Sequence, residues 1–392
     1  MRFTRKLSFA LVLLLLFLLP GGAARANIAY TTAGAEPLSG RVGIVSITGS
    51  GSADVSPSVL TGQPSDATVF AFEREEDRYV LVCTGGGTGT RVSAYSLARG
   101  WAAPTVSADW PTLRGLRGLD VSDNGRSLFA AGYDSGNIIE IRTETLLPTG
   151  TTLVCSVDAG HVARAVQVCV RHQELYGLFS VTGSGGVPAQ GRLFRLDGQL
   201  KPYSSFDVGL DVADMALYDD KRMIAMSGAG IGGADGGVNV FDPNRDKVSH
   251  FISADVYGTV TAVCEDGEDG LYFIGSRGGA SQATLYHWKK SGITTVQGIA
   301  AGGENCRMVW DGDSRTMALS TGGSILLFKD KQLLRTLSGA ELGGTVTSLT
   351  AFREAREEDN SSSCSAVGAG LWAMFLPLAF LCRRGTNALR RS

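Results

Sequence analysis

One short segment recurs along the chain and limits what the chain can fold into. It carries an aliphatic residue at its second position, an aliphatic or aromatic residue at its fifth and usually a polar residue at its sixth, and nearly every copy follows a Gly-rich turn. The seven copies are residues 41–46, 91–96, 137–142, 192–197, 237–242, 284–289 and 324–329. The second residues of the first and last copies, Val42 and Ile325, lie 283 positions apart over six steps, which gives a period of roughly 47 residues.

A repeat of this length made only of strands is typical of a β-propeller, in which each repeat forms one four-stranded blade. We expect an innermost strand A, a polar turn, strand B, the recurring segment as strand C, and a less regular strand D. The first repeat lacks strand A, whereas an unmatched A-type strand, residues 345–352, follows the last repeat. We therefore predict an all-β, seven-bladed propeller over residues 27–352, closed by this C-terminal strand. An open two-sheet or sandwich arrangement is the alternative.

The period and strand pattern of residues 27–352 resemble the broad class of extracytoplasmic propellers that includes WD-repeat and YVTN-type proteins. The sequence contains a single Trp-Asp dipeptide, Trp310-Asp311, and no YVTN quartet. The resemblance therefore implies the blade architecture and a place outside the cytoplasm, and names no ligand or reaction.

The N-terminus has the order of a secretory signal peptide. Basic residues (Arg2, Arg5 and Lys6) precede an apolar run over residues 7–19, and Ala24-Arg25-Ala26 forms an A-x-A cleavage site. We predict a signal peptide over residues 1–26, with cleavage between Ala26 and Asn27. An uncleaved membrane anchor is the alternative, although the apolar run is short for a span.

The tail changes composition sharply after Phe352. We divide it into a charged and Ser-rich spacer (353–363), a sorting signal or membrane segment (364–384) and a basic stub (385–392). The order resembles a bacterial C-terminal sorting signal of the Synerg-CTERM type, and the matching residues are Cys364, Gly368, Gly370, Pro377, Leu378, Arg383 and Arg384. The resemblance implies processing at Cys364 by a sorting enzyme at the membrane, and a tether at the cell surface or outer envelope. An ordinary C-terminal membrane helix is the alternative.

The net charge limits the kind of partner, and the cysteine pattern indicates the state of the thiols. The formal charge of −2 includes eight basic residues in the signal peptide and in the tail beyond Cys364, two segments that hold no acid, so the body between them carries −10. An acidic body without a basic stripe argues against nucleic acid as a partner. The five body cysteines, which lie mostly on apolar strand patterns, favour buried thiols over disulfides. These are Cys83, Cys155, Cys169, Cys264 and Cys306.

No motif in the sequence predicts a cofactor, a metal site or a catalytic residue. Residues 228–233 satisfy G-x-G-x-x-G, but a strand follows where a dinucleotide fold needs a helix. The four histidines are scattered, and His287 is expected to pack inside a blade. The Asp-rich segments at Asp123 and Asp266 lack the spacing of a calcium loop and suit hairpin turns.

Most of the polar and aromatic side chains that could form a site lie in the connections between blades. In a propeller the B–C and D–A loops share one face, around the mouth of the central channel. The B–C loops here are small and Gly-rich, whereas the D–A loops carry Trp110, Arg114, Arg117, Asp158, His161, Arg164, Asp211, Asp214, Asp255, Tyr257, Glu304 and Glu341. Among these we expect a binding face that includes Trp110, Arg114, His161, Arg164, Asp214, Asp255, Tyr257 and Glu304.

The sequence thus predicts a surface-anchored, monomeric binding or interaction module that recognises an extracellular or envelope ligand. Two alternatives stay open. One is a propeller enzyme, hydrolase-like or lactonase-like, that uses carboxylates at the channel such as Asp214 and Glu304. The other is a passive structural component of the envelope.

Overall fold

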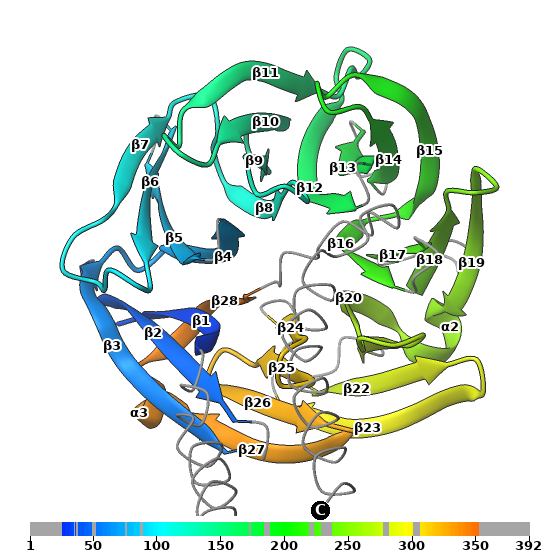
Figure 1. The fold of residues 1–392 in the computed structure, drawn as a ribbon. Coiled ribbons are helices and arrows are strands. Elements are labelled where there is room, and N and C mark those ends of the chain that lie inside the picture. The colour runs from blue at the N-terminus through cyan, green and yellow to red at the C-terminus, as the bar shows by residue number, and fades with distance from the viewer. Residues whose placement is uncertain are drawn as a thin grey trace, which may run out of the picture. The chain divides into compact units, whose positions relative to one another are not determined.

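The chain forms seven four-stranded antiparallel sheets, which the computed structural model arranges around a common centre (Figure 1). The structure describes residues 26–352 except 35, 37, 49–51, 75–76, 87–88, 172–173, 184–188, 219–222, 229–236, 277–281 and 301–305. The predicted seven-bladed propeller is therefore confirmed over this part of the chain. The predicted signal peptide up to residue 25, the spacer and the sorting signal lie outside the described residues.

Each blade runs from an inner strand A to an outer strand D, as the repeat predicts. Blade 2 holds β4 (Thr68–Arg74), β5 (Asp77–Gly86), β6 (Gly89–Ser96) and β7 (Val106–Trp110). Blade 3 holds β8 (Leu116–Val121), β9 (Ser127–Gly132), β10 (Asn137–Arg142) and β11 (Pro148–Val154). Blade 4 holds β12 (Val162–Arg171), β13 (Glu174–Thr182), β14 (Gln190–Leu196) and β15 (Pro202–Leu210).

The second half of the ring repeats this order. Blade 5 holds β16 (Val212–Tyr218), β17 (Met223–Gly228), β18 (Gly237–Asp242) and β19 (Lys247–Ser253). Blade 6 holds β20 (Thr259–Glu265), β21 (Leu271–Ser276), β22 (Gln282–Lys289) and β23 (Gly292–Ala300). Blade 7 holds β24 (Arg307–Asp311), β25 (Thr316–Ser320), β26 (Ser324–Lys329) and β27 (Gln332–Ser338). Two one-turn helices, α2 (Ala254–Tyr257) and α3 (Gly339–Leu342), lie in D–A connections.

Blade 1 closes the ring with strands from both ends of the described chain. Its sheet order is β28-β1-β2-β3, so the C-terminal β28 (Thr345–Ala351) supplies strand A. The other strands are β1 (Ala26–Ala33), β2 (Gly40–Ile47) and β3 (Ala53–Gln63). The side chains of Ser348 and Thr350 also accept hydrogen bonds of 3.2 Å from the backbone amides of Val69 and Ala71 in β4. The predicted closure is confirmed, and it joins blade 1 to both neighbours.

The core consists of apolar layers between neighbouring blades rather than one central mass. One cluster packs Phe72 and Trp110 of blade 2 against Leu128 and Ile141 of blade 3. Comparable clusters of described residues fill each of the other six junctions around the ring. Because successive side chains of a strand point to opposite faces, each inner strand supplies residues to two junctions.

The structure also tests the predictions about the cysteines, His287 and the Gly-rich segment. The five body cysteines are buried thiols, and burial raises the pKa of Cys83 and Cys264. His287 is only 2% exposed, as expected for a packed blade residue. The G-x-G-x-x-G segment joins β17 to the antiparallel β18, which confirms that a strand follows it. No helix among the described residues is long and apolar enough to cross a membrane.

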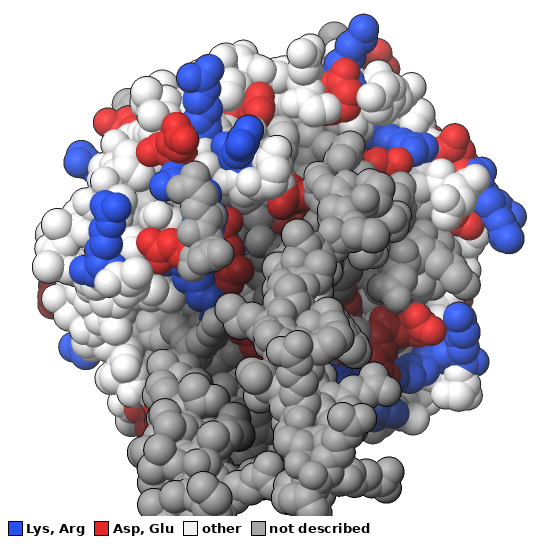
Figure 2. All heavy atoms as spheres, viewed as in Figure 1, with Lys and Arg blue, Asp and Glu red and all other residues white. Residues whose placement is uncertain are grey.

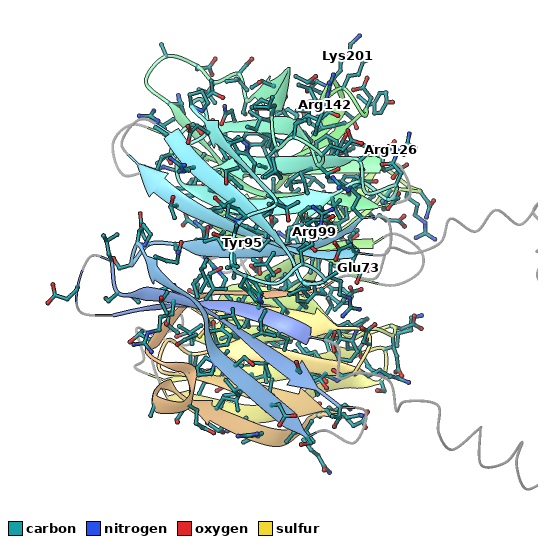
Figure 3. All side chains as sticks on the ribbon, turned by 60° about the vertical axis from the view of Figure 1, so that its left-hand side comes forward. Glu73, Tyr95, Arg99, Arg126, Arg142 and Lys201 are labelled. Atoms are coloured by element: carbon teal, nitrogen blue, oxygen red, sulfur yellow. The ribbon has the colours of Figure 1, made fainter. Side chains whose placement is uncertain are left out.

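The sheet topology gives the molecule two distinct faces. The A–B and C–D turns lie on one face, and the B–C turns and D–A connections lie on the other. Figure 3 shows Arg126 and Arg142 of blade 3 and Lys201 of blade 4 on the same side of the sheets, the side of the A–B and C–D turns. We refer to the opposite side, with the B–C turns and D–A connections, as the mouth face.

Candidate binding site at the channel mouth

A stack of three side chains stands at the mouth face between blades 3 and 4. Tyr133 lies in the B–C turn that follows β9, Arg117 is the second residue of β8, and Arg164 is the third residue of β12. The guanidinium carbons of Arg117 and Arg164 lie 4.8 and 4.7 Å from the centre of the Tyr133 ring. Both distances are those of cation–π contacts, so one aromatic ring holds two positive charges in place.

The backbone around Tyr133 fixes the position of this ring. The Tyr133 amide donates to the Gly115 carbonyl at 2.8 Å, and the Asp134 amide donates to the Arg114 carbonyl at 3.1 Å. Gly115 has a φ of +62°, and a Cβ there would lie 2.4 Å from a carboxylate oxygen of Asp134. Only glycine fits this left-handed position so close to the neighbouring turn. The D–A connection and the B–C turn of blade 3 therefore form one rigid unit.

Positive charge at this site is only partly compensated. Arg164 lies 3.7 Å from Asp134, with both side chains well exposed. Arg117 donates to the Ala213 carbonyl at 3.3 Å, and no carboxylate among the described residues lies within ion-pair distance of it. Burial and the charge of Arg307 lower the pKa of Arg117, although Tyr133 and Asp214 act in the opposite direction. The guanidinium groups of Arg117 and Arg307 repel each other, and this repulsion favours an anionic ligand.

Asp214 lies in the channel wall and binds backbone amides. One of its carboxylate oxygens accepts from the Met215 amide at 2.9 Å, and the other accepts from the Val263 amide of β20 at 3.2 Å. Burial raises the pKa of Asp214, and Arg307, the two amides and Gln167 oppose this rise. A carboxyl group with a raised pKa beside a channel can serve in acid–base chemistry, but here it also joins blade 5 to blade 6.

The same bridging arrangement occurs two blades earlier. Asp120 of β8 accepts from its neighbour Val121 at 2.9 Å and from Val170 of β12 at 2.7 Å. Ser348 and Thr350 make equivalent bridges from β28 to β4. The recurrence indicates that polar side chains on the inner strands hold adjacent blades together. The bridging role of Asp214 therefore follows from the fold and does not by itself indicate catalysis.

The prediction that Trp110 belongs to the binding face is wrong. Trp110 is the last residue of β7 and is wholly buried in the layer between blades 2 and 3. Its indole nitrogen donates to the Leu146 carbonyl at 2.7 Å, which satisfies the one polar group of the ring. A partner cannot reach this side chain, because it is buried between two blades. Trp110 is the last residue of the outer strand and does not lie in the loop that follows.

The other predicted residues occupy different depths on the mouth face. Arg114, His161 and Asp255 are exposed, and Arg164 belongs to the stack. Tyr257 is partly buried and packs edge-on against Phe273 and Tyr286, with ring centroids 5.5 and 5.0 Å apart. Glu304 lies outside the described residues. The structure thus brings Arg164 together with Arg117, and it sets Asp255 and Tyr257 on α2 in a different D–A connection.

Sequence reasoning missed Tyr133, Gln167 and Arg307. The B–C loops appeared too small and Gly-rich to contribute, yet the B–C turn of blade 3 supplies the central ring of the stack. A usable signal was present, since Tyr133 directly follows a strand in a turn of otherwise small and polar residues. Among the described residues, no group of three or more His, Cys, Asp or Glu side chains could hold a metal ion.

The fold and this site define the molecule as a seven-bladed β-propeller with a polar channel mouth. No protein-family model matches the chain, and no curated protein matches its sequence. The comparison with solved structures finds two putative 6-phosphogluconolactonases, from Bacteroides fragilis (TM-score 0.59, 12% identity) and Bacteroides uniformis (TM-score 0.60, 10% identity). The alignments cover 84% of this chain and 99% and 100% of those chains.

A third similar structure is the β-propeller domain of Cps50 (Swd1) from Myceliophteria thermophila. Its TM-score is 0.52 at 12% identity, and the alignment covers 78% of this chain and 98% of that chain. All three identities are far too low to carry over an activity. These similarities therefore establish the propeller fold and nothing finer.

Proposed function

We propose that the protein is an exported binding module that recognises an extracellular or envelope partner at its mouth face, through an anionic group of that partner. The observation that carries this proposal is the stack of Arg117, Tyr133 and Arg164. The ring occupies one plane of each guanidinium, and the N–H edges remain suited to a carboxylate or phosphate. The positive charge of Arg307, which acts on Arg117 at this site, favours the same kind of ligand.

The predicted C-terminal tether is compatible with a binding site on the mouth face. The first residue of β1 and the last residue of β28 both lie on the face of the A–B and C–D turns, because each borders an A–B connection. The described chain therefore ends on the face opposite the mouth, so a tether beyond Phe352 would not begin at the proposed site. Tethering also raises the effective concentration of a weak binder, so a modest affinity would suffice.

The charge pattern of the opposite face also supports a localised site. Figure 2 shows this face, where Lys and Arg side chains alternate with Asp and Glu side chains around the rim. Among the described residues that this view shows, no continuous basic stripe is visible. Such a mixture suits neither a long nucleic acid nor a polyanion spread across the face. An anionic partner is better accommodated by the small cationic cluster at the mouth.

The experiment that tests the proposal uses citrate as a carboxylate probe. Isothermal titration at low salt should show binding to the processed protein, weakened about tenfold or more by Arg117→Gln or Arg164→Gln, since each removes one charged partner. Arg126→Gln is the matched control, because Arg126 is exposed on the opposite face. Equal affinity in all variants, or no binding at any salt concentration, would leave the mouth without a role in anion recognition and favour a passive envelope component.

Export and anchoring are tested separately from binding. In the proposal, cleavage falls between Ala26 and Asn27, and the tail is processed at Cys364. Cys364→Ser should leave folding and citrate binding unchanged while preventing correct placement at the cell surface. Unchanged fractionation together with an unchanged tail mass would contradict the sorting-signal proposal and favour an ordinary membrane helix.

A second candidate function is hydrolysis at the channel. The observation that favours it is the raised pKa of Asp214, in a fold shared with two putative 6-phosphogluconolactonases. Asp214→Asn keeps the shape of the side chain and one of its two acceptor oxygens, and removes its acid–base function. If the protein hydrolyses a simple sugar lactone such as glucono-δ-lactone, this variant should abolish turnover while remaining folded. Turnover that survives Asp214→Asn, or no turnover in the unmodified protein, would argue against this candidate.

A further inference from the structure

A second polar site lies on the face opposite the channel mouth, at the junction of blades 4 and 5. It is a depression of about 480 Å³, lined by Glu174, Arg195, Leu196, Tyr203, Ser204 and Asp246. Glu174 begins β13, Arg195 and Leu196 end β14, and Tyr203 and Ser204 are the second and third residues of β15. Asp246 comes from the C–D turn of blade 5. This volume falls within the range of small-molecule sites, roughly 300–1,000 Å³.

Arg195 fixes the two carboxylates of the depression. Its guanidinium lies 2.5 Å from an oxygen of Glu174 and 3.2 Å from an oxygen of Asp246, so it joins two blades. The hydroxyl of Tyr176 donates to the second oxygen of Glu174. Glu174 and Arg195 are thereby held in one orientation, and their side chains remain 21% and 26% exposed. A polar group that is fixed before a ligand arrives loses little conformational entropy on binding.

Tyr203 adds an exposed aromatic ring to this polar set. It is 71% exposed, the only aromatic residue among the large apolar side chains that the described surface exposes. Leu196 also borders the depression but is only 1% exposed, so Tyr203 supplies the accessible apolar surface. An exposed ring beside fixed hydrogen-bonding groups provides both a flat apolar surface and directed polar contacts. That combination fits a ligand with an apolar face and a polar edge.

We propose that this depression binds a saccharide. The C–H face of a sugar ring would lie against Tyr203, while its hydroxyls contact the groups that Arg195 organises. A hydroxyl both donates and accepts hydrogen bonds, so it can use the carboxylates of Glu174 and Asp246 together with the Arg195 guanidinium and the Ser204 hydroxyl. A cationic ligand would use only the acceptors, and Arg195 already neutralises part of their charge. The mixed donors and acceptors therefore favour a neutral polyol over an amine.

The test uses chitotetraose, cellotetraose and maltotetraose as probes of the processed full-length protein. At least one should bind with millimolar or tighter affinity in a calorimetric titration. Tyr203→Ala should weaken that binding roughly tenfold or more, because the stacking surface is lost. Tyr203→Phe should retain it, since the ring face remains. Saturation-transfer NMR should show contact through the sugar C–H protons.

The matched control is Leu333→Ala. Leu333 is the second residue of the outer strand of blade 7, as Tyr203 is of blade 4, and its side chain is 41% exposed. This variant should bind as the unmodified protein does. The proposal is overturned if no probe binds at up to about 10 mM, or if Tyr203→Ala binds as tightly as Leu333→Ala. It is also overturned if spermidine binds, loses affinity in Asp246→Asn, and no saccharide competes with it.

Discussion

At the scale of single residues, Asp266 at the A–B turn of blade 6 is a buried carboxylate held by several partners. Its carboxylate lies 2.8 Å from His287 Nε2 and accepts from the backbone amides of Glu268 and Gly270 at 2.8 and 2.9 Å. Burial alone would raise its pKa. These hydrogen bonds and the charge of Lys289 outweigh burial and lower the pKa of Asp266 to about 2.

This depressed pKa has a consequence for stability in acid. A carboxyl whose folded-state pKa lies below its ordinary value of 3.8 stabilises the fold above pH 4, and this stability is lost as the pH falls through 2. Asp266→Asn should lower the free energy of unfolding near neutral pH by about 2 kcal/mol and flatten the pH dependence in that window. Urea unfolding between pH 7 and 2 measures both. Asp269→Asn, 61% exposed, is the control and should keep the native pH dependence.

A glycine in an inner strand also limits the geometry of the channel. A Cβ on Gly118 would lie 2.0 Å from the amide oxygen of Gln167 and 2.9 Å from its Cα, so β8 and β12 could not stay this close. Gly118→Ala should lower the free energy of unfolding by about 1–3 kcal/mol. Gly198→Ala is the control, since nothing lies within 4 Å of its Cβ position. Similar unfolding curves for the two variants would contradict the close approach.

At the scale of elements, the strands could be predicted from the sequence and the contacts between loops could not. The recurring segment predicted β2, β6 and β10 because hydrophobic pattern and Gly-rich turns are local properties. The missing first strand and the spare last one predicted the closure of blade 1. The stack on Tyr133 was not predictable, because it joins a B–C turn to two inner strands. Trp110 was misplaced because strand ends are the least certain positions in such a pattern.

The closing strand β28 gives a prediction at this scale. Val346, Leu349 and Phe352 are buried, and burying three such side chains contributes on the order of 5 kcal/mol. Ending the chain before Thr345 should therefore lower the stability of the whole domain and also expose the edges of β1 and β4. Thermal unfolding compares this truncation with a chain that ends at Phe352. Equal melting temperatures would show that the ring does not depend on β28.

At the scale of the whole molecule, the propeller presents two faces with separate proposed roles. The mouth face carries the Arg117, Tyr133 and Arg164 stack and the predicted contacts Arg114 and His161. The opposite face carries the depression at Tyr203 and both ends of the described chain. Since apolar layers join every blade to its neighbours, substitutions on exposed turns of either face should leave the ring intact. The two proposals can therefore be tested independently in one folded protein.

The most direct test of the central proposal is site-specific photo-crosslinking in the native host. A photoreactive residue is placed in turn at Arg114 and His161 on the mouth face, and at Arg126 and Asp269 on the A–B turns of the opposite face. All four positions are exposed, so a difference in adducts reports which face a partner contacts. We predict defined adducts from Arg114 and His161 that Arg117→Gln abolishes, and none from Arg126 or Asp269. Equal adducts from both faces, or adducts from the A–B turns alone, would contradict binding at the channel mouth.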